Sequence, residues 1–316
     1  MPYSVLPFAE DHVEPAARLF LDAYRREQSS SPLLPSRLLE DPAPIRQALA
    51  ARLGNPGVVI VQGQRVLAYM LEGARFAWKG QQAALVPEYG HAAVEEDKRD
   101  LYQRLYMALA QEWADQHVHL HLLGHLAHDA VLQETIYQLG LGAILAERLR
   151  DLSAVAGAPE VRIVEERDPR RLLDLQLEHN RYYPQSPIFV RKPVDQAEVL
   201  AELDAQVRQG DLFLVAHDGD EPGAYVTVGE STHEGEGFLL QRTNTAQIKS
   251  AYARPASRGK GIATALLRAA VAWAQREGFE RLFVEHETAN YSGGRFWRKH
   301  FWPYVCFSMR YIDSSM

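Results

Sequence analysis

The chain has 316 residues, roughly twice the usual size of a single domain, so its length predicts two domains. Its 34 Lys and Arg against 41 Asp and Glu give a formal net charge of −7, which argues against a nucleic-acid-binding protein, because such proteins carry a basic face. The apolar fraction of 47% is typical of globular proteins, and no run approaches the ~18 consecutive apolar residues of a membrane span.

The first half of the chain alternates between strand and helix patterns. In chain order, it contains a strand followed by an amphipathic helix (3–24), a second helix ending at glycine (43–54), a hairpin (58–71), a further strand, and a long helix (100–116). A strand, a short helix and a terminal strand close this half. This combination of strand and helix patterns predicts an α/β fold.

The second half repeats the same order. The corresponding elements are a strand with its helix (161–183), a helix ending at glycine (194–210), a hairpin (212–229) and a long helix (261–278). At an offset of 160, Trp113 corresponds to Trp273. The small residues of "SAVAGAPE" are typical of a linker. We therefore predict a duplicated chain with a first domain at 1–152, a linker at 153–160 and a second domain at 161–316.

A glycine-rich turn, "RPASRGKG", separates the strand at 246–253 from the long helix of the second half. A helix amino terminus offers unpaired N–H groups and the positive end of the helix dipole. Glycines allow an anion to approach this backbone, and Arg258 and Lys260 supply charge-assisted hydrogen bonds. The turn therefore indicates a phosphate or pyrophosphate site, with a solvated turn that needs glycine only for its geometry as the alternative.

Two phosphate-binding schemes compete for this turn. "GKGIAT" is similar to a dinucleotide fingerprint with Thr264 in place of the last glycine, which would indicate a nicotinamide oxidoreductase. The 52 residues after Thr264 are too few for the remaining strands of such a domain.

The second scheme is a resemblance. Arg258-x-x-Gly261-x-Ala263 is similar to the acyl-CoA pyrophosphate loop of the GNAT N-acetyltransferase superfamily. Residues 282–313 resemble the closing strand, helix and strand of that family, with Asn290 and Gly293 at its Asn-x-x-Ala/Gly step and Phe296-Trp297 at its aromatic pair. Phe301 replaces the glycine of the usual Gly-Phe-x-Pro. The resemblance covers 160–313 well and 1–150 in outline.

The resemblance implies two tandem GNAT-like acyl-CoA N-acyltransferase domains, each a mixed, mostly antiparallel sheet flanked by helices. It implies direct transfer of an acetyl group from acetyl-CoA, the cosubstrate, to a primary amine of a small molecule or peptide. The implied cofactor-binding residues are Ala251, Ala253, Arg258, Gly259, Lys260, Gly261, Ile262, Ala263, Thr264, Asn290, Gly293, Phe296 and Trp297.

The family also implies catalytic positions. An interrupted strand at Ala251–Tyr252–Ala253 would aim backbone N–H groups at the thioester oxygen. The glutamate that some relatives use as a base falls on Gln247, so Glu285 and Glu287 become candidate bases, with His286 interpreted as a core residue.

The general acid is less well defined by the resemblance. The tyrosine that many relatives use falls on Trp297, and Tyr291 and Tyr304, which are nearby in the sequence, could substitute for it or have structural roles. The catalytic set is therefore expected among Tyr252, Glu285, Glu287 and Tyr304. A thiol with a pKa of about 8.5 is a tolerable leaving group without an acid. A non-catalytic acyl-CoA-binding protein is the alternative function.

The equivalent turn of the first half has different chemistry. It contains no glycine, and Glu95, Glu96 and Asp97 precede the helix. Because carboxylates repel a pyrophosphate and occupy the helix terminus themselves, we expect this half to keep the fold without the cofactor loop. Nearby, His117, His119 and His121 alternate along a possible strand. With no completing ligand pattern, we predict no metal site.

Only a few residues indicate the cellular location of the protein and the charge of its acceptor. The amino-terminal stretch lacks a basic segment followed by an apolar one, so we expect no signal peptide. The single cysteine, Cys306, fits a reducing, cytoplasmic location and is interpreted as core packing. The acidic segments "HDGDEPG" and "HEGEG" mildly favour a cationic acceptor.

Overall fold

The computed structural model describes residues 3–78, 80–218, 221–231, 238–240 and 243–315. It divides the chain into two compact units, one of Met1–Ala146 with Pro303–Met316 and one of Glu147–Trp302. The last strand of the chain therefore belongs to the first unit. The predicted α/β class is confirmed, whereas the repeat boundaries at 152 and 161 stay a prediction. In the part of the chain described, no helix combines the length and the apolarity that crossing a bilayer requires.

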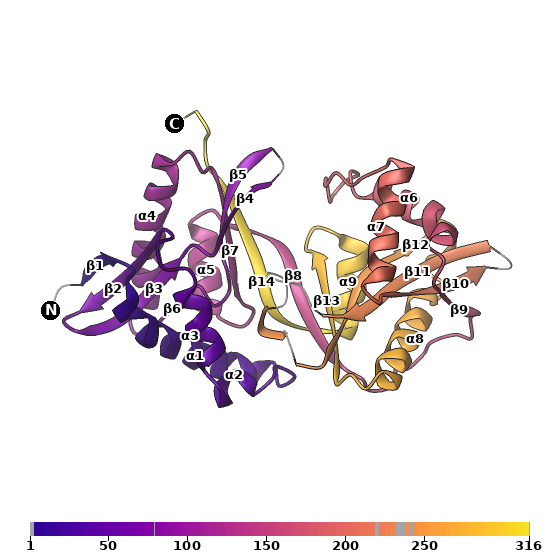
Figure 1. Ribbon diagram of the computed structural model, residues 1–316, viewed down its shortest axis with the longest axis horizontal. Helices are drawn as coiled ribbons and strands as arrows, with labels where there is room; N and C mark the ends of the chain where they lie inside the picture. The colour runs from indigo at the N-terminus through magenta and orange to yellow at the C-terminus, as the bar shows by residue number, and fades with distance from the viewer. Residues whose placement is uncertain (1–2, 79, 219–220, 232–237, 241–242, 316) are drawn as a thin grey trace. The chain divides into compact units, whose positions relative to one another are not determined.

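The first unit contains two groups of paired strands (Figure 1). Its elements are β1 (Ser4–Pro7), α1 (Val13–Ser30), α2 (Arg37–Glu40), α3 (Ala43–Ala50), β2 (Gly57–Gln62), β3 (Arg65–Leu71), β4 (Ala74–Trp78), β5 (Gln81–Val86), β6 (His91–Ala93), α4 (Lys98–Asp115), β7 (Leu120–Leu126), α5 (Ala130–Gln138), β8 (Gly142–Asp151, crossing the boundary) and β14 (Trp302–Tyr311). The strand orders are β1-β2-β3-β6 and β4-β5-β7-β14. The single strand expected after the first hairpin is in fact three strands, β4 to β6.

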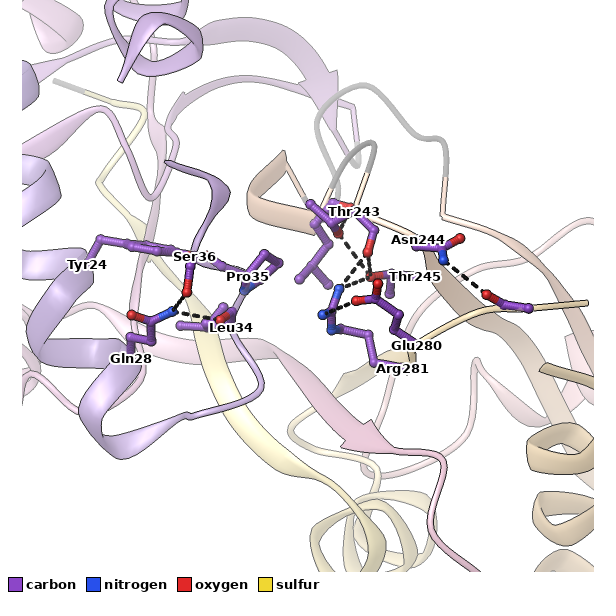
Figure 2. Close-up of polar contacts among 12 residues, drawn as sticks. Tyr24, Gln28, Leu34, Pro35, Ser36, Thr243, Asn244, Thr245, Glu280 and Arg281 are labelled. Carbon is purple, nitrogen blue, oxygen red and sulfur yellow. Dashed lines mark hydrogen bonds and ion pairs between the residues drawn. The ribbon is translucent and has the colours of Figure 1, made fainter. Parts of the chain in front are cut away.

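Helix α4 forms the centre of the first unit's core. Leu101, Leu105, Leu109 and Trp113 recur every four residues, so they share one helix face, and all are buried in a cluster with residues of β2 and β3. At the other end of the unit, the turn after α1 is fixed by side chains. Gln28 Nε2 donates to the Leu34 carbonyl at 2.9 Å (Figure 2).

The second unit contains five consecutive strands of a sheet, in the order β13-β12-β11-β10-β9. Its elements are β9 (Ile163–Glu166), α6 (Leu173–Tyr182), α7 (Gln196–Arg208), β10 (Leu212–Asp218), β11 (Glu221–Glu230), β12 (Thr245–Ala253), α8 (Ile262–Arg276), β13 (Arg281–Glu287) and α9 (Tyr291–His300). All neighbouring pairs are antiparallel except β12 and β13, which are parallel. The predicted mixed, mostly antiparallel sheet flanked by helices is confirmed.

Helices cover both faces of this sheet (Figure 1). Leu212 and Leu214 pack in the cluster of α8, whereas Phe213 and Val215 pack in the cluster of α6 and α7. Since alternate residues of a strand point to opposite faces, both faces of β10 are buried, which explains its unbroken apolar run. The α8 face predicted from helical periodicity is buried as expected, with Ile262, Leu266, Leu267, Ala270, Val271 and Ala274 in the core.

Hydrogen bonds fix the start of the parallel pair. Thr245 lies opposite Arg281, whose Nη1 donates to the Thr243 carbonyl at 2.5 Å (Figure 2). Asn244 Nδ2 donates to the Gly278 carbonyl at 3.0 Å. The two strands are therefore anchored where they enter the sheet, at the end far from the glycine-rich turn.

The segment expected to be a linker lies along α8 within the second unit. Gln275 Nε2 donates to the Leu152 carbonyl at 2.8 Å, and Arg268 Nη2 donates to the Pro159 carbonyl at 3.2 Å. Val155 packs against the apolar cluster of α8. These contacts tie the segment to the helix that follows the glycine-rich turn.

Candidate active site

A cavity of about 220 Å³ lies in the second unit where β12 and β13 separate. The register of these strands runs from Thr245 opposite Arg281 to Ile248 opposite Val284, while β12 continues to Ala253 in pairing with β11. Residues of α6, β11, β12, α8, β13 and α9 line the cavity. The sheet is thus open at one point, with helices on both sides of the opening.

A β-bulge in β12 marks the start of the separation. Thr227 of β11 lies opposite Ser250, but Val228 lies opposite Ile248, so Lys249 is the extra residue. The bulge lies two residues before Ala251–Tyr252–Ala253, the stretch where the interruption of the strand is expected from the sequence. The Nζ of Lys249 forms a 2.6 Å ion pair with Asp211 in a buried position beside it.

The bulge decides which backbone groups face the opening. The N–H of Arg254 donates to the Gly223 carbonyl at 3.0 Å, so it points toward β11. Because hydrogen-bonding direction alternates along a strand, the N–H groups of Ala251 and Ala253 point the other way, into the opening. Two backbone N–H groups that point into the same opening can donate hydrogen bonds to a carbonyl oxygen. For Ala251 and Ala253, binding of the thioester oxygen stays a prediction.

Side chains divide the cavity into two sides. On the side of α8 and α9 the lining is largely apolar, with Ala251, Ala253, Ala263, Leu266, Leu267, Phe296 and Trp297. On the side of α6 it is polar and aromatic, with His179, Tyr182, Tyr183, Tyr225, Ser250 and Tyr252. An elongated apolar group and a polar group could therefore meet at the opening in the sheet.

The glycine-rich turn leads directly into α8. Gly259 and Gly261 have φ angles of 76° and 78°, in the left-handed region that favours glycine. Thr264 and Ala265 donate their N–H groups to the Gly261 carbonyl, so this is where the helical hydrogen bonds begin. Of the predicted loop residues, Arg258 and Ala263 line the cavity, while Gly259, Lys260, Gly261, Ile262 and Thr264 form the turn without being part of its lining.

The two glycines have different surroundings. A Cβ on Gly261 would lie 2.9 Å from Pro159 Cδ, whereas a Cβ on Gly259 would meet nothing within 4 Å. Gly261 is therefore required by both its φ angle and the close approach of the 153–160 segment. Gly259 is required only by its φ angle, so it tolerates a change of side chain better.

The cations of the turn have distinct partners. Arg254 forms an ion pair with Glu178 at 2.9 Å. The guanidinium of Arg258 lies 5.2 Å from the ring centre of Tyr182 and 5.9 Å from that of Tyr252, and its Nε donates to the Ala253 carbonyl at 3.0 Å. Arg258 is therefore part of the cavity wall.

The predicted Asn-x-x-Gly step caps α9. Asn290 Oδ1 accepts a hydrogen bond from the Gly293 N–H at 3.0 Å, and a Cβ on Gly293 would lie 2.8 Å from Asn290 Nδ2. The next turn carries the aromatic pair, with the Phe296 and Trp297 ring centres 4.9 Å apart and nearly perpendicular. All four residues line the cavity.

The three ionisable residues at the end of β13 have different roles. His286 Nε2 accepts from Arg148 Nε at 2.9 Å, and its Nδ1 donates to the Glu287 carbonyl at 3.0 Å. Burial lowers the pKa of His286 to about 4, so it is neutral and both nitrogens are engaged. Glu285 and Glu287 lie in the cavity lining. Burial and the nearby negative charge of Glu287 raise the pKa of Tyr183.

Three candidates from the sequence lie outside the cavity lining. Tyr304 is fully buried within the first unit, where its carbonyl accepts from the Ala127 N–H at 2.9 Å. Gln247 is buried, and among the described residues its Oε1 has no hydrogen-bond partner. Tyr291 is 68% exposed. Neither Tyr291 nor Tyr304, the two tyrosines expected as possible acids, lines the cavity, whereas Tyr252 of the expected catalytic set does.

The aromatic residues of α6 and β11 were not among the residues expected at the site. His179 Nδ1 hydrogen-bonds to the Tyr225 hydroxyl at 2.9 Å, and its ring stacks on Tyr252 with centres 5.1 Å apart. Burial, with smaller effects of Lys192 and Arg258, lowers the pKa of His179 to about 3. A signal existed, because His179, Tyr182 and Tyr183 are three and four residues apart and so share a helix face.

The histidines of the first unit have structural partners. His121 donates through Nε2 to the Val118 carbonyl at 3.1 Å and contacts the Tyr106 hydroxyl at 2.9 Å. Across the described ranges, no group of three or more His, Cys, Asp or Glu is arranged to hold a metal ion. The acidic segment at 233–237 lies outside the described residues, as do Gly219 and Asp220 of the other acidic segment.

Comparison with known proteins agrees with this geometry. Residues 172–301 match the family model of the acetyltransferase (GNAT) family. A GCN5-related N-acetyltransferase from Sphaerobacter thermophilus is similar in structure, with a TM-score of 0.60 at 14% identity over 98% of this chain and 95% of that one. A tandem GNAT protein from the clavulanic acid biosynthesis pathway has a TM-score of 0.51 at 13% identity over 98% of both chains.

A search of curated protein sequences finds no match. The structural likenesses cover both halves of the chain at low identity and therefore show the fold, whereas the family model covers the half that contains the cavity. The chain thus has the tandem GNAT fold that the sequence predicted, and its residues 172–301 match the model of the acetyltransferase (GNAT) family.

Proposed function

We propose that this protein is an N-acetyltransferase that moves the acetyl group of acetyl-CoA directly to a primary amine. The family match supports acyl transfer as the general activity. The observation that carries the proposal is the opening between β12 and β13, which has an apolar side next to the glycine-rich turn and a polar side beyond it. A cosubstrate and an acceptor can meet there from opposite faces of the sheet.

In this proposal, the turn at the start of α8 binds the pyrophosphate of acetyl-CoA. The N–H groups of Gly261, Ile262 and Ala263 precede the first hydrogen bonds of the helix and carry its positive partial charge. The pantetheine chain would follow the apolar side of the cavity, along Leu266, Phe296 and Trp297. This route leads the thioester to the N–H groups of Ala251 and Ala253.

The transfer step then follows from the groups at the opening. The amine nitrogen forms a bond to the acetyl carbon, negative charge develops on the thioester oxygen beside the Ala251 and Ala253 amides, and the carbon–sulfur bond breaks to release CoA thiolate. The amine must be neutral to attack, since an ordinary ammonium has a pKa of about 10.4. Glu285 and Glu287, directly or through water, are the proposed proton acceptors.

Tyr252 is the proposed donor of a proton to the departing thiolate. Its ring lines the cavity, and burial raises the pKa of its hydroxyl, which keeps the proton in place. Because the CoA thiol has a pKa near ~8.5, loss of this donor would slow the reaction without abolishing it. We also place the protein in the cytoplasm, on its single cysteine.

The cofactor half of the proposal is tested by calorimetric titration of acetyl-CoA into wild type, Gly259→Asp and Gly259→Asn. Both substitutions fit the open space at Gly259, and Asp and Asn tolerate a left-handed φ. The Asp variant adds a negative charge beside the pyrophosphate and should weaken binding by about tenfold or more, whereas the isosteric Asn variant should stay close to wild type. Equal binding by both variants would contradict the placement of the pyrophosphate.

The transfer itself is tested by release of free CoA thiol with a panel of primary amines. A non-catalytic acyl-CoA-binding protein is the second candidate, because Gln247 and Trp297 occupy the positions of a glutamate and a tyrosine that the resemblance associates with catalysis. Tight acetyl-CoA binding without amine-dependent thiol release would favour this second candidate.

A further inference from the structure

The α6 side of the cavity is an aromatic wall built around His179. We use this name for His179, Tyr182, Tyr183, Tyr225 and Tyr252. The His179 ring lies 5.0 Å from that of Tyr183, 5.1 Å from that of Tyr252 and 6.0 Å from that of Tyr225. Tyr182 extends the wall, 6.5 Å from both Tyr183 and Tyr252. Burial keeps His179 neutral, so the wall carries no positive charge of its own.

Cations of the chain itself already lie against the rings of this wall. Lys192, an exposed residue of the segment between α6 and α7, places its Nζ 5.0 Å from the ring centre of Tyr183. Arg258 lies over Tyr182 and Tyr252. Aromatic faces attract cations at such distances, and the attraction grows when water is excluded. The rings are therefore suited to positive charge, and an exposed lysine is readily displaced from its ring.

Carboxylates complete the surroundings of Tyr183. The negative charges of Glu287 and, to a smaller extent, Glu285 raise the pKa of its hydroxyl, and both glutamates line the cavity. Both glutamates follow directly after Val284, the last residue of β13 that pairs with β12. An ammonium near the Tyr183 ring would thus have an aromatic face and two negative charges within reach of the opening.

We infer that the acceptor is an amine with a second positive charge, and that this second charge replaces the Lys192 ammonium on the Tyr183 face. The reacting nitrogen must be uncharged when it attacks, so a site that stabilises a cation serves a different nitrogen, one that stays charged throughout. The inference rests on the proposed function and names its acceptor as a dicationic alkyl amine, for which 1,4-diaminobutane is the probe.

The test compares 1,4-diaminobutane with butylamine, which has the same chain with one charge. Each is titrated by calorimetry into the protein with and without saturating CoA, so that no turnover is needed. Wild type should bind the diamine at least tenfold more tightly. Lys192→Met should raise the diamine affinity several-fold, because it removes the competing cation, whereas Lys192→Arg should not. A gain in affinity cannot arise from misfolding.

Two further variants locate the second charge. Tyr183→Leu removes the aromatic face and should lower the preference for the diamine to within about threefold, and Glu287→Gln should lower it by several-fold. Equal affinities of the two amines in wild type, or a Lys192→Met variant no tighter than wild type, would overturn the inference. If acetyl-CoA fails to bind, the proposed function is wrong. The amine titrations on the protein alone still show whether the second positive charge of the amine is recognised.

Discussion

The starts of α4 and α8 use one backbone geometry for two kinds of chemistry. Both helices begin after a residue in the left-handed region, Asp97 with φ 55° before α4 and Gly261 with φ 78° before α8. Before α8 the turn offers glycines and backbone N–H groups. Before α4 the buried Lys98 forms ion pairs with Glu95 at 3.0 Å and Asp129 at 2.5 Å. In the first unit, side chains of the protein itself thus occupy the start of α4.

A second pair of regions shows the same contrast. In the second unit, β12 and β13 separate around the cavity. In the first unit, β6 pairs with β3 and β7 pairs with β5 and β14. There the buried His91 of β6 reaches β7, since its Nε2 donates to the Gly124 carbonyl at 2.7 Å while its Nδ1 lies 3.0 Å from the Tyr102 hydroxyl. An imidazole thus occupies the place where the other unit has an opening.

In the first unit, polar side chains at the start of α4 and beside β6 bind one another. The corresponding parts of the second unit form the glycine-rich turn and the cavity, where we propose that a ligand binds. Substitutions in the two units should therefore affect different properties, namely stability in the first unit and ligand binding in the second.

The largest expected effect on stability is at Lys98. Lys98→Met leaves the carboxylates of Glu95 and Asp129 without their buried cation and should lower the free energy of unfolding by about 3 kcal/mol. Urea denaturation followed by circular dichroism measures this. The matched control is Arg99→Met, whose exposed ion pair with Glu134 should contribute under about 1 kcal/mol. Similar losses in both variants would contradict the structural role of Lys98.

A smaller effect is expected at His91. His91→Ala removes the buried imidazole and should lower the free energy of unfolding by about 2–3 kcal/mol, because its two partners, the Tyr102 hydroxyl and the Gly124 carbonyl, are left unsatisfied. The acetyl-CoA affinity should not change. A variant with wild-type stability, or with weakened acetyl-CoA binding, would contradict a purely structural role of His91 in the first unit.

The smallest effect is the pH dependence of His91. Burial lowers its pKa in the folded chain to about 4, against an ordinary value of 6.5. Between these values the unfolded chain binds a proton that the folded chain does not, so stability falls as the pH falls. By pH 5 the loss should reach about 1.5 kcal/mol for this residue. His91→Gln, which keeps a hydrogen-bonding group without titrating, should show a correspondingly flatter profile between pH 6.5 and 5, and an unchanged slope would contradict the assignment.

Much of the fold could be predicted from the sequence because periodicity and glycine positions are local signals. The apolar face of α8 and the hairpins β2–β3 and β10–β11 follow from such patterns. The hairpin of β4 and β5 was missed because its residues, "ARFAWKGQQAALV", are mostly small or polar and resemble a loop. Tyr304 could not be placed either, since the unit to which the last strand belongs depends on its pairing with β7.

The candidate site could be predicted from the sequence where the backbone conformation requires a particular residue type. Gly261 needs its φ angle and its contact with Pro159, and Gly293 accommodates the cap formed by Asn290. The aromatic wall was not predicted, because His179 and Tyr225 come from a helix and a strand 46 residues apart and meet only through packing. The bulge at Lys249 likewise depends on its buried partner Asp211.

We propose that the second unit alone has a cofactor site. The most direct test is the stoichiometry of acetyl-CoA binding to the full chain by calorimetry, in wild type and in Gly259→Asp. We predict one molecule bound per chain in wild type and greatly weakened binding in the variant. Two molecules per chain, or one molecule whose affinity is unaffected by Gly259→Asp, would contradict this account of the two units.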